Sequence, residues 1–213
     1  IPRDISNLVL YRNKTLIPTK PQNLEELINV ISKSKNFGIS YERNIYFMMP
    51  YILTFEEDIY NPQKSLKFYR NLEGKYAPKP SDIGSSTLAQ MFLNGKIGLY
   101  LSGRWIYPKI KENANFDWDV ITFPGTVQLD ASGWAISKES HNIEEARKFV
   151  EYLSSKETSK YFAQTDLIVP ARIDVSKTID NKTFLDAIKK SKTINYDKNY
   201  RKKTDEMNKN LFN

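Results

Sequence analysis

Short apolar runs alternate along the chain with longer stretches in which apolar residues recur at helical spacing. The short runs are rich in strand-forming residues and are bounded by Gly, Pro, Asn or Asp, as half-buried strands are. We predict strands over 6–12, 37–41, 97–101, 118–123 and 131–137. The stretch 167–172 is predicted to be extended because it contains Pro170.

Apolar residues three or four positions apart predict amphipathic helices between these runs. The pair Asn23 and Glu26 has the spacing of a helix-capping box, and Asn142 and Glu145 repeat it. Ser86 is predicted to cap another helix. The predicted helices cover 24–34, 62–72, 88–94, 106–112, 143–153, 155–164 and 183–190.

The segment Ile45–Thr54 is too uniformly apolar for a surface position, so we predict a buried helix around Pro50. This is also the region of the longest apolar stretch, which is far shorter than the roughly 20 residues that a membrane-spanning helix needs. Strands separated by helix-length segments predict an α/β fold with parallel strand pairing.

Composition narrows the possible chemistry. The chain has 213 residues, no Cys and one His, which excludes thiolate nucleophiles, Cys-based metal sites and sites built on several imidazoles. Of the net charge of +7, a balance of +5 lies within residues 176–213, where ten Lys and Arg face five Asp and Glu. A charge run of this kind typically marks a solvated face, and no nucleic-acid partner is expected.

Few residues are suited to catalysis. The single His, His141, lies just before a predicted helix cap, where a surface role is the common one. Carboxylates cluster at 56–58 and flank Trp118 as Asp117 and Asp119, but carboxylates in loops are mostly solvated. No phosphate-binding loop, dinucleotide fingerprint or metal-ligand spacing occurs, so no metal or organic cofactor is expected.

The aromatic residues are more informative. Trp105 follows Gly103 and Arg104 at a strand-to-helix turn, and Trp134 follows Gly133 in an extended segment. Both lie near predicted strand ends, where open α/β sheets bind ligands. A flat ring beside a guanidinium suits a polyhydroxylated ligand, although core packing is the commoner role of any single Trp. Trp118, at the start of an apolar strand, is predicted to be in the core.

Six segments, in this order, are similar to the bacterial extracellular solute-binding proteins of ABC sugar importers (family 1), the family that includes maltose-binding protein. None of them is diagnostic alone, but together they extend the resemblance over nearly the whole chain. The segments are PRDISNLVLYRNK from Pro2, PQNLEEL from Pro21, MFLNGKIGLYLSGRW from Met91, DWDVITFPG from Asp117, GWAISKESHNIEEARKFVEYL from Gly133 and LIVPAR from Leu167.

The resemblance implies a type II periplasmic-binding-protein fold, in which two α/β lobes joined by crossing strands enclose a sugar. It implies that residues 1–15 form the first crossing, 16–130 the second lobe, 131–166 part of the first lobe, and 167–213 a return crossing with a helical tail. Because family members are longer, we expect a fragment with one complete lobe that lacks the start of the first lobe. The helices at 143–153 and 155–164 would then be exposed or covered by a second copy in a homo-oligomer.

The resemblance also implies ligand-binding residues. Trp105 matches the aromatic of the family's G-x-W turn, where Arg104 replaces a frequent Pro, and Trp134 matches a cleft-lining position. Arg172 matches a basic residue of the last crossing. Asp4 and Tyr11, on the first crossing, are weaker candidates for the cleft floor.

The function implied is the extracytoplasmic, non-enzymatic substrate-binding component of a carbohydrate importer, with an ABC permease as partner. One alternative is a carbohydrate-active hydrolase that uses the Glu56–Asp58 acids. Another is a polyanion-binding module that uses the basic tail.

Overall fold

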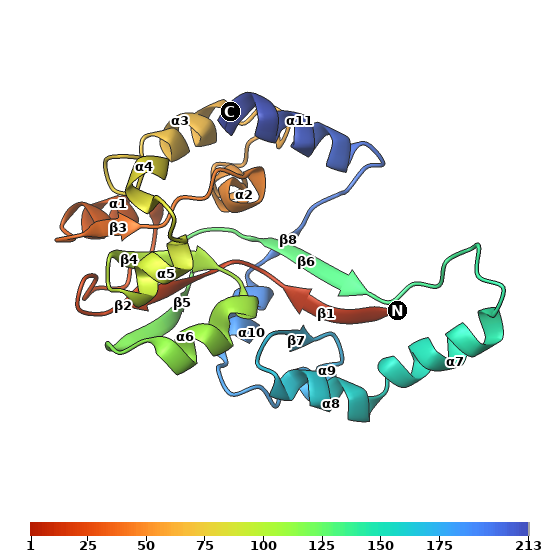
Figure 1. Cartoon of the computed structure of the whole chain (residues 1–213). Coiled ribbons are helices and arrows are strands. Elements are labelled where there is room, and N and C mark those ends of the chain that lie inside the picture. Colours follow the sequence, from red (N-terminus) through yellow and green to blue (C-terminus); the bar gives the residue numbers. More distant parts are fainter. Residues whose placement is uncertain (213) are drawn as a thin grey trace.

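Two four-stranded sheets organise residues 1–212, the part of the chain that the computed structural model describes (Figure 1). In spatial order, the larger sheet contains β3 (Phe37–Ile39), β4 (Ile97–Ser102), β2 (Val9–Asn13) and β5 (Trp118–Thr122). The smaller sheet contains β7 (Val169–Pro170), β1 (Pro2–Ser6), β6 (Gln128–Gly133) and β8 (Lys192–Thr193). The mixture of helices with these sheets confirms the predicted α/β class.

Most helices pack around the larger sheet (Figure 1). Those between β2 and β5 are α1 (Leu24–Ser32), α2 (Ile45–Thr54), α3 (Gln63–Arg70), α4 (Pro80–Ile83), α5 (Leu88–Leu93), the short 3-10 helix η1 (Arg104–Ile106) and α6 (Tyr107–Asn113). After β6 follow α7 (Ile143–Leu153), α8 (Lys156–Gln164), α9 (Ile173–Ser176), α10 (Thr183–Lys189) and α11 (Tyr200–Phe212). Helix α10 returns to pack on β5, and α11 returns to α2.

Of the three predicted caps, Asn23 acts as expected, whereas Asn142 precedes α7 but its side chain makes no capping hydrogen bond. The Asn23 side chain accepts a hydrogen bond from the Glu26 N–H at 2.9 Å, so α1 begins where the sequence indicates. The predicted buried helix around Pro50 is α2. The cap of α5 is Thr87 and not Ser86, because the Thr87 hydroxyl accepts from the Gln90 N–H at 3.1 Å.

The strand predicted over 6–12 is two strands in two different sheets. β1 ends at Ser6 in the smaller sheet and β2 begins at Val9 in the larger one. Only Asn7 and Leu8 separate them, and both are buried. The apolar run is continuous because the chain remains buried while it passes from one sheet to the other.

Within residues 1–212, the predicted parallel pairing holds for β3 with β4 and for β6 with β8, but it is wrong for the other four strand pairs. β2 pairs antiparallel with β4 and with β5, and β1 pairs antiparallel with β6 and with β7. The strands that helices connect do run in the same direction: β3 and β4 are parallel neighbours, and β4 and β5 share a direction. β2, which enters from the smaller sheet, is inserted between β4 and β5 and runs against both.

The strand predicted over 131–137 is displaced toward the N-terminus. β6 covers Gln128–Gly133, and its pairing with β1 ends where Gly133 faces Pro2. Residues 135–139 are exposed and belong to no strand. They lead into a segment that we call the α7–α8 arm, defined as residues 134–166.

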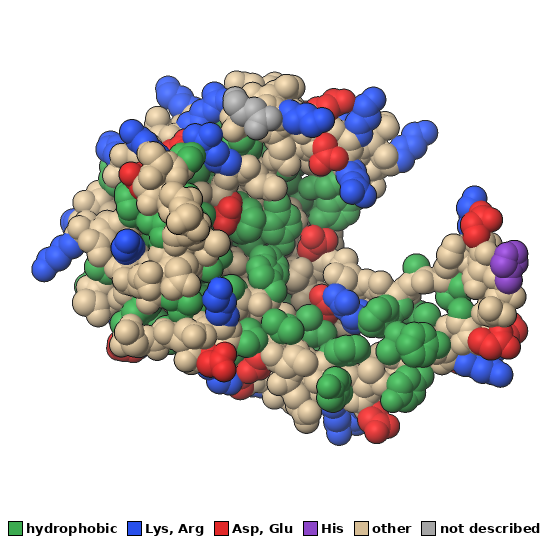
Figure 2. Space-filling model, viewed as in Figure 1, with side chains coloured by type: hydrophobic (Ala, Val, Ile, Leu, Met, Phe, Trp, Pro, Cys, Tyr) green, Lys and Arg blue, Asp and Glu red, His purple; other side chains and the backbone are tan. Residues whose placement is uncertain are grey.

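The α7–α8 arm carries apolar side chains in solvent, as expected. Helix α7 has no buried residue, although its apolar residues lie along one stripe. Figure 2 shows hydrophobic side chains gathered over this region, at the lower right of the view. The largest exposed ones are Ile143, Phe149, Tyr152 and Tyr161, of which Tyr161 is 68% exposed.

Two hydrophobic cores lie on opposite faces of the larger sheet. From Leu8, just before β2, to Tyr11, side chains alternate between the cores: Leu8 and Leu10 enter one, and Val9 and Tyr11 enter the other. All four are at most 1% exposed. Across residues 1–212, every helix is too short or too polar to span a bilayer.

A buried ion pair joins the central strand β2 to β5. The Arg12 guanidinium donates to both carboxylate oxygens of Asp119, at 2.8 and 2.9 Å, and also donates to the carbonyls of Ile17 and Pro18. Only 5% of the Arg12 side chain is exposed. Burial acts to raise the pKa of Asp119, but hydrogen bonds from Arg12 and Lys20 outweigh it and hold the pKa below its ordinary value.

We predict that Asp119→Asn lowers the free energy of unfolding by roughly 3 kcal/mol at neutral pH, because it leaves the buried Arg12 charge without its partner. Since folding depresses the pKa of Asp119, its contribution is present above about pH 4 and is lost below it. The difference between wild type and variant, measured by urea unfolding, should therefore narrow at acid pH.

Asp117→Asn is the matched control. Asp117 lies two residues before Asp119 and forms an ion pair with Lys14, but 72% of its side chain is exposed. We expect a change below about 0.5 kcal/mol. Equal losses for the two variants would contradict the importance assigned to burial of Arg12.

Candidate functional site

A cleft of about 410 Å³ lies where the two sheets meet. Its walls come from segments far apart in sequence: strand β1, helix α2, the turn after β4, strand β6, and the stretch that leads into β7. The lining residues are Arg3, Asp4, Ile5, Ser6, Tyr46, Arg104, Trp105, Asp130, Ser132, Leu167, Ile168 and Val169. Concave sites with an apolar body and a few polar groups are the usual form of small-molecule sites.

Trp105 provides the largest aromatic surface of the cleft, with 42% of the residue exposed. Its indole lies directly across Gly103: a Cβ at that position would be 2.0 Å from the ring. The turn therefore requires glycine for close approach, although its φ of −97° is open to any residue. The position of Trp105, the predicted ligand-stacking residue, is thus determined by the turn at Ser102–Trp105.

Tyr11 supports this turn from the core instead of lining the cleft. Its ring is fully buried, and its hydroxyl donates to the Gly103 carbonyl at 2.8 Å. Burial raises the pKa of the hydroxyl, which stays protonated and able to donate. The structure therefore places Tyr11 outside the lining, because alternation along β2 turns the side chain into a core.

Tyr46 is a cleft residue that the sequence analysis missed. It lies in the first turn of α2, half-buried, with its ring centroid 6.4 Å from that of Trp105. Burial and the negative charge of Asp130 raise the pKa of its hydroxyl. The apolar run around Pro50 indicated a buried helix but carried no sign that this position faces a cleft.

Asp4 lines the cleft as predicted, but its carboxylate is already paired with the neighbouring Arg3. Asp130 and Ser132, on β6, face the same space and were not predicted. Within residues 1–212, no ion pair is formed by Asp130, whose carboxylate accepts a bond from the N–H of Ala131. The Asp130 carboxylate can therefore accept hydrogen bonds from hydroxyl groups of a ligand in the cleft.

Trp134 stands behind the cleft wall and not in its lining. Arg3, which does line the cleft, lies over its ring, with the guanidinium 5.3 Å from the ring centroid. The ring also faces Phe162 of α8, at 6.3 Å. The indole N–H is buried and has no hydrogen-bond partner.

Arg172 is exposed, outside the cleft lining, and paired with Asp174 at 3.1 Å. Arg104 does border the cleft and is 3% exposed. Its guanidinium, however, is packed against the rings of Tyr107 and Phe184 and paired with Asp166 at 2.7 Å. Neither guanidinium is presented to the cleft in the way that ligand binding would require.

The carboxylates that suggested a hydrolase lie elsewhere. Glu57 caps α3: its carboxylate accepts from the N–H groups of Lys64 and Ser65 and from the Ser65 hydroxyl. Burial acts against ionisation, but these hydrogen bonds outweigh it and lower the pKa of Glu57. Glu56 and Asp58 are exposed, and none of the three lines the cleft. Residues 1–212 contain no cluster of three or more His, Asp or Glu suited to a metal ion.

The sequence matches the profile of the bacterial extracellular solute-binding proteins over residues 1–191. The chain belongs to this family. Its members are extracellular or periplasmic binding proteins and not enzymes. The predicted resemblance is thereby confirmed.

A curated relative agrees with this family assignment. The chain is 25% identical to the maltodextrin-binding protein MdxE of Bacillus subtilis over 84% of its own length and 51% of that protein's length. It therefore spans about half the length of this curated relative.

Solved structures show the fold. An ABC substrate-binding protein of Listeria monocytogenes in complex with cycloalternan matches 99% of this chain with a TM-score of 0.82 at 20% identity, and 64% of its own chain is covered. The maltodextrin-binding domain MalE of Bdellovibrio bacteriovorus bound to maltotriose gives 0.81 at 20% identity, over 99% of this chain and 66% of that one. These likenesses confirm the predicted type II binding-protein fold.

We predict that Gly103→Ala destabilises the protein by roughly 1–3 kcal/mol, because the new methyl group and the Trp105 ring cannot share the same space. In a Trp105→Ala background the same substitution should cost less than about 0.5 kcal/mol. Urea unfolding of the four proteins in this cycle measures the difference. An equal cost in both backgrounds would show that the ring does not lie on Gly103.

Proposed function

We propose that this chain is the ligand-binding part of an ABC importer and that it binds a carbohydrate in the cleft at Trp105. The exposed indole in a cleft between two sheets is the observation that carries the proposal. The C–H face of a sugar ring packs on such an aromatic surface, and its hydroxyl groups require polar partners at the rim. Membership of the solute-binding family and likeness to proteins solved with maltotriose or cycloalternan support it.

The polar groups of the cleft argue against an anionic ligand, because Asp130 is the lining charge that no ion pair within residues 1–212 neutralises. Two of its lining residues are cationic, Arg3 and Arg104, and two are anionic, Asp4 and Asp130. Arg3 and Asp4 neutralise each other, and Arg104 is neutralised from behind. Tyr46, Ser6 and Ser132 add hydroxyl groups that both donate and accept, as sugar hydroxyls do.

Two lobes that close around the ligand supply the mechanism. In this proposal residues 16–130 form the second lobe, 131–166 belong to the first, and 1–15 and 167–213 cross between them. A ligand that contacts both lobes stabilises the closed state, because both sets of contacts exist only there. The closed form would be recognised outside the cytoplasm by an ABC permease.

Calorimetric titration with maltotriose, cycloalternan and monosaccharides tests the proposal, in the natural polypeptide that contains this chain. Trp105→Ala should weaken binding of the best sugar by roughly tenfold or more, which is about 1.4 kcal/mol, because the stacking surface is lost.

Trp118→Phe is the matched control. Trp118 packs in the core beside Tyr11 and Tyr107 and is not a cleft residue, so its replacement should leave sugar affinity within about twofold. Undiminished binding after Trp105→Ala would remove the proposed site. Binding of a peptide or polyamine and of no sugar would remove the proposed ligand class.

A further inference from the structure

Asp166 occupies the turn between α8 and β7, at the end of the α7–α8 arm. Its φ of 60° is in the left-handed region, which Asp and Asn adopt more readily than other non-glycine residues. The next three residues, 167–169, line the same cleft as Trp105. The position of Asp166 therefore bears directly on the width of the cleft.

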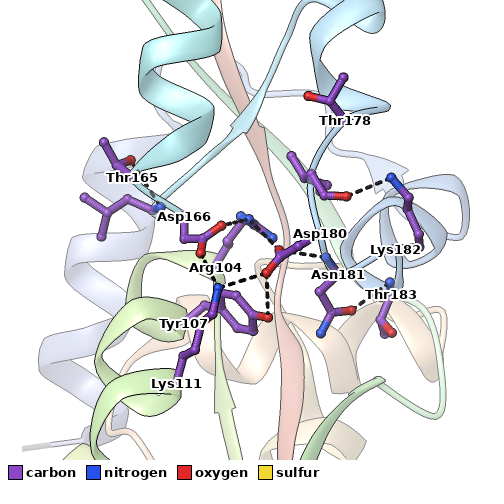
Figure 3. Close-up of polar contacts among 12 residues, drawn as sticks. Arg104, Tyr107, Lys111, Thr165, Asp166, Thr178, Asp180, Asn181, Lys182 and Thr183 are labelled. Carbon is purple, nitrogen blue, oxygen red and sulfur yellow. Dashed lines mark hydrogen bonds and ion pairs between the residues drawn. The ribbon is translucent and has the colours of Figure 1, made fainter.

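Four charged groups form a closed ring around this turn (Figure 3). Asp166 accepts from Arg104 at 2.7 Å and from Lys111 at 2.9 Å. Asp180 accepts from Lys111 at 3.1 Å and from Arg104 at 3.4 Å. Arg104 and Lys111 belong to the segment that follows β4, and Asp180 lies just before α10, which packs on β5. Three members of the ring are thus attached to the larger sheet and one to the arm.

Asp166 makes all the direct polar contacts between the arm and residues 16–130 among the hydrogen bonds and ion pairs of residues 1–212. Both of these contacts, from Arg104 and Lys111, end on its carboxylate. The remaining polar contacts of the arm are internal or run to Ile1, to the adjacent Leu167 and to Asp174. At its other end the arm joins β6 through residues 134–142, which contain no helix or strand.

The burial of Arg104 gives the contact its strength. The side chain is 3% exposed, and its Nε and Nη1 groups have no hydrogen-bond partner. Without Asp166, this charge would keep only the longer contact with the half-exposed Asp180. A buried charge that loses its partner is costly, so the structure favours the arrangement in which the arm stays attached. The hydrogen bonds that Lys111 donates to Asp166 and to Asp180 raise the pKa of Lys111, which agrees with a stable ring.

We propose that Asp166 is an electrostatic latch that holds the α7–α8 arm against the second-lobe residues Arg104 and Lys111 and thereby sets the opening of the cleft. Releasing it lets the arm move about its connections to β6 and β7, carrying Leu167 and Ile168, which precede the paired strand β7, away from Trp105. This part of the proposal concerns the chain itself; only its effect on ligand affinity rests on the proposed function.

The latch is tested by measuring the separation of the arm from the second lobe. Because the sequence has no cysteine, Lys67→Cys on α3 and Lys148→Cys on α7 give two unique, exposed attachment points for spin labels. Double electron–electron resonance on the 213-residue chain then reports the distance distribution between them. Asp166→Asn removes the charge and keeps a residue suited to the left-handed backbone. We expect a broader distribution, shifted to longer distances.

Glu151→Gln is the matched control, since it removes one negative charge from the arm at an ion pair with Arg147 that lies wholly within α7. It should leave the distribution unchanged. Lys111→Gln, at a side chain that is 53% exposed, removes one of the two partners of Asp166 and should give a smaller shift in the same direction. If Asp166→Asn does not fold, the distance distribution of Lys111→Gln tests the latch instead.

An unchanged distribution in folded Asp166→Asn, or an equal change in Glu151→Gln, would overturn the latch. Sugar titration of the same variants separates the two proposals: a wild type that binds no sugar contradicts the proposed function and leaves the distance result to decide the latch. If the wild type binds sugar, a released latch should weaken that binding, because fewer molecules hold both walls in place before the ligand arrives.

Discussion

The double burial of strand β2 is the constraint on which the rest of the structure depends. β2 has hydrogen-bonded neighbours on both edges and a hydrophobic core on each face, so its position in the larger sheet is fixed from every side. It is joined by two residues to β1 in the smaller sheet, which fixes where the sheets meet. Its first residue, Val9, faces Ser102 at the end of β4. Because Gly103–Trp105 follows Ser102, this turn lies where the two sheets meet. The position of β2 thus determines where this wall of the cleft lies.

The local structure was largely predictable because short-range physics determines it. The Asn23 cap, the buried helix at 45–54 and the glycine beneath Trp105 each depend on neighbours within a few residues. Strand pairing was not predictable in the same way: the 6–12 run gives no sign that β2 is inserted between two strands it opposes, because that order depends on where distant strands lie. The site residues divide similarly. Trp105 was found from its turn, whereas Tyr46, Asp130 and Ser132 gather in the cleft only through the arrangement of helices and sheets.

Arg104 illustrates how residue type alone misleads. A guanidinium beside a tryptophan suggests ligand recognition, and the side chain does border the cleft. Packing against the Tyr107 and Phe184 rings leaves the charge desolvated, and two aspartates, Asp166 and Asp180, pair with its Nη2 group there. The resemblance to the family implies that Arg replaces a frequent Pro at this position, and the structure shows that the side chain forms an ion pair with Asp166 of the arm.

The exposed apolar stripe of α7 affects the local stability and the solution behaviour of the chain. Ile143, Phe149 and Tyr152 stay more than half exposed, so tertiary packing stabilises this helix little, and its backbone bonds and the Arg147 ion pairs give only marginal stability to eleven residues in water. Its amides should exchange with solvent much sooner than those of β2, and proteases should cut first in the connecting residues 135–139. The same exposed stripe should bind detergents, hydrophobic dyes and hydrophobic column matrices.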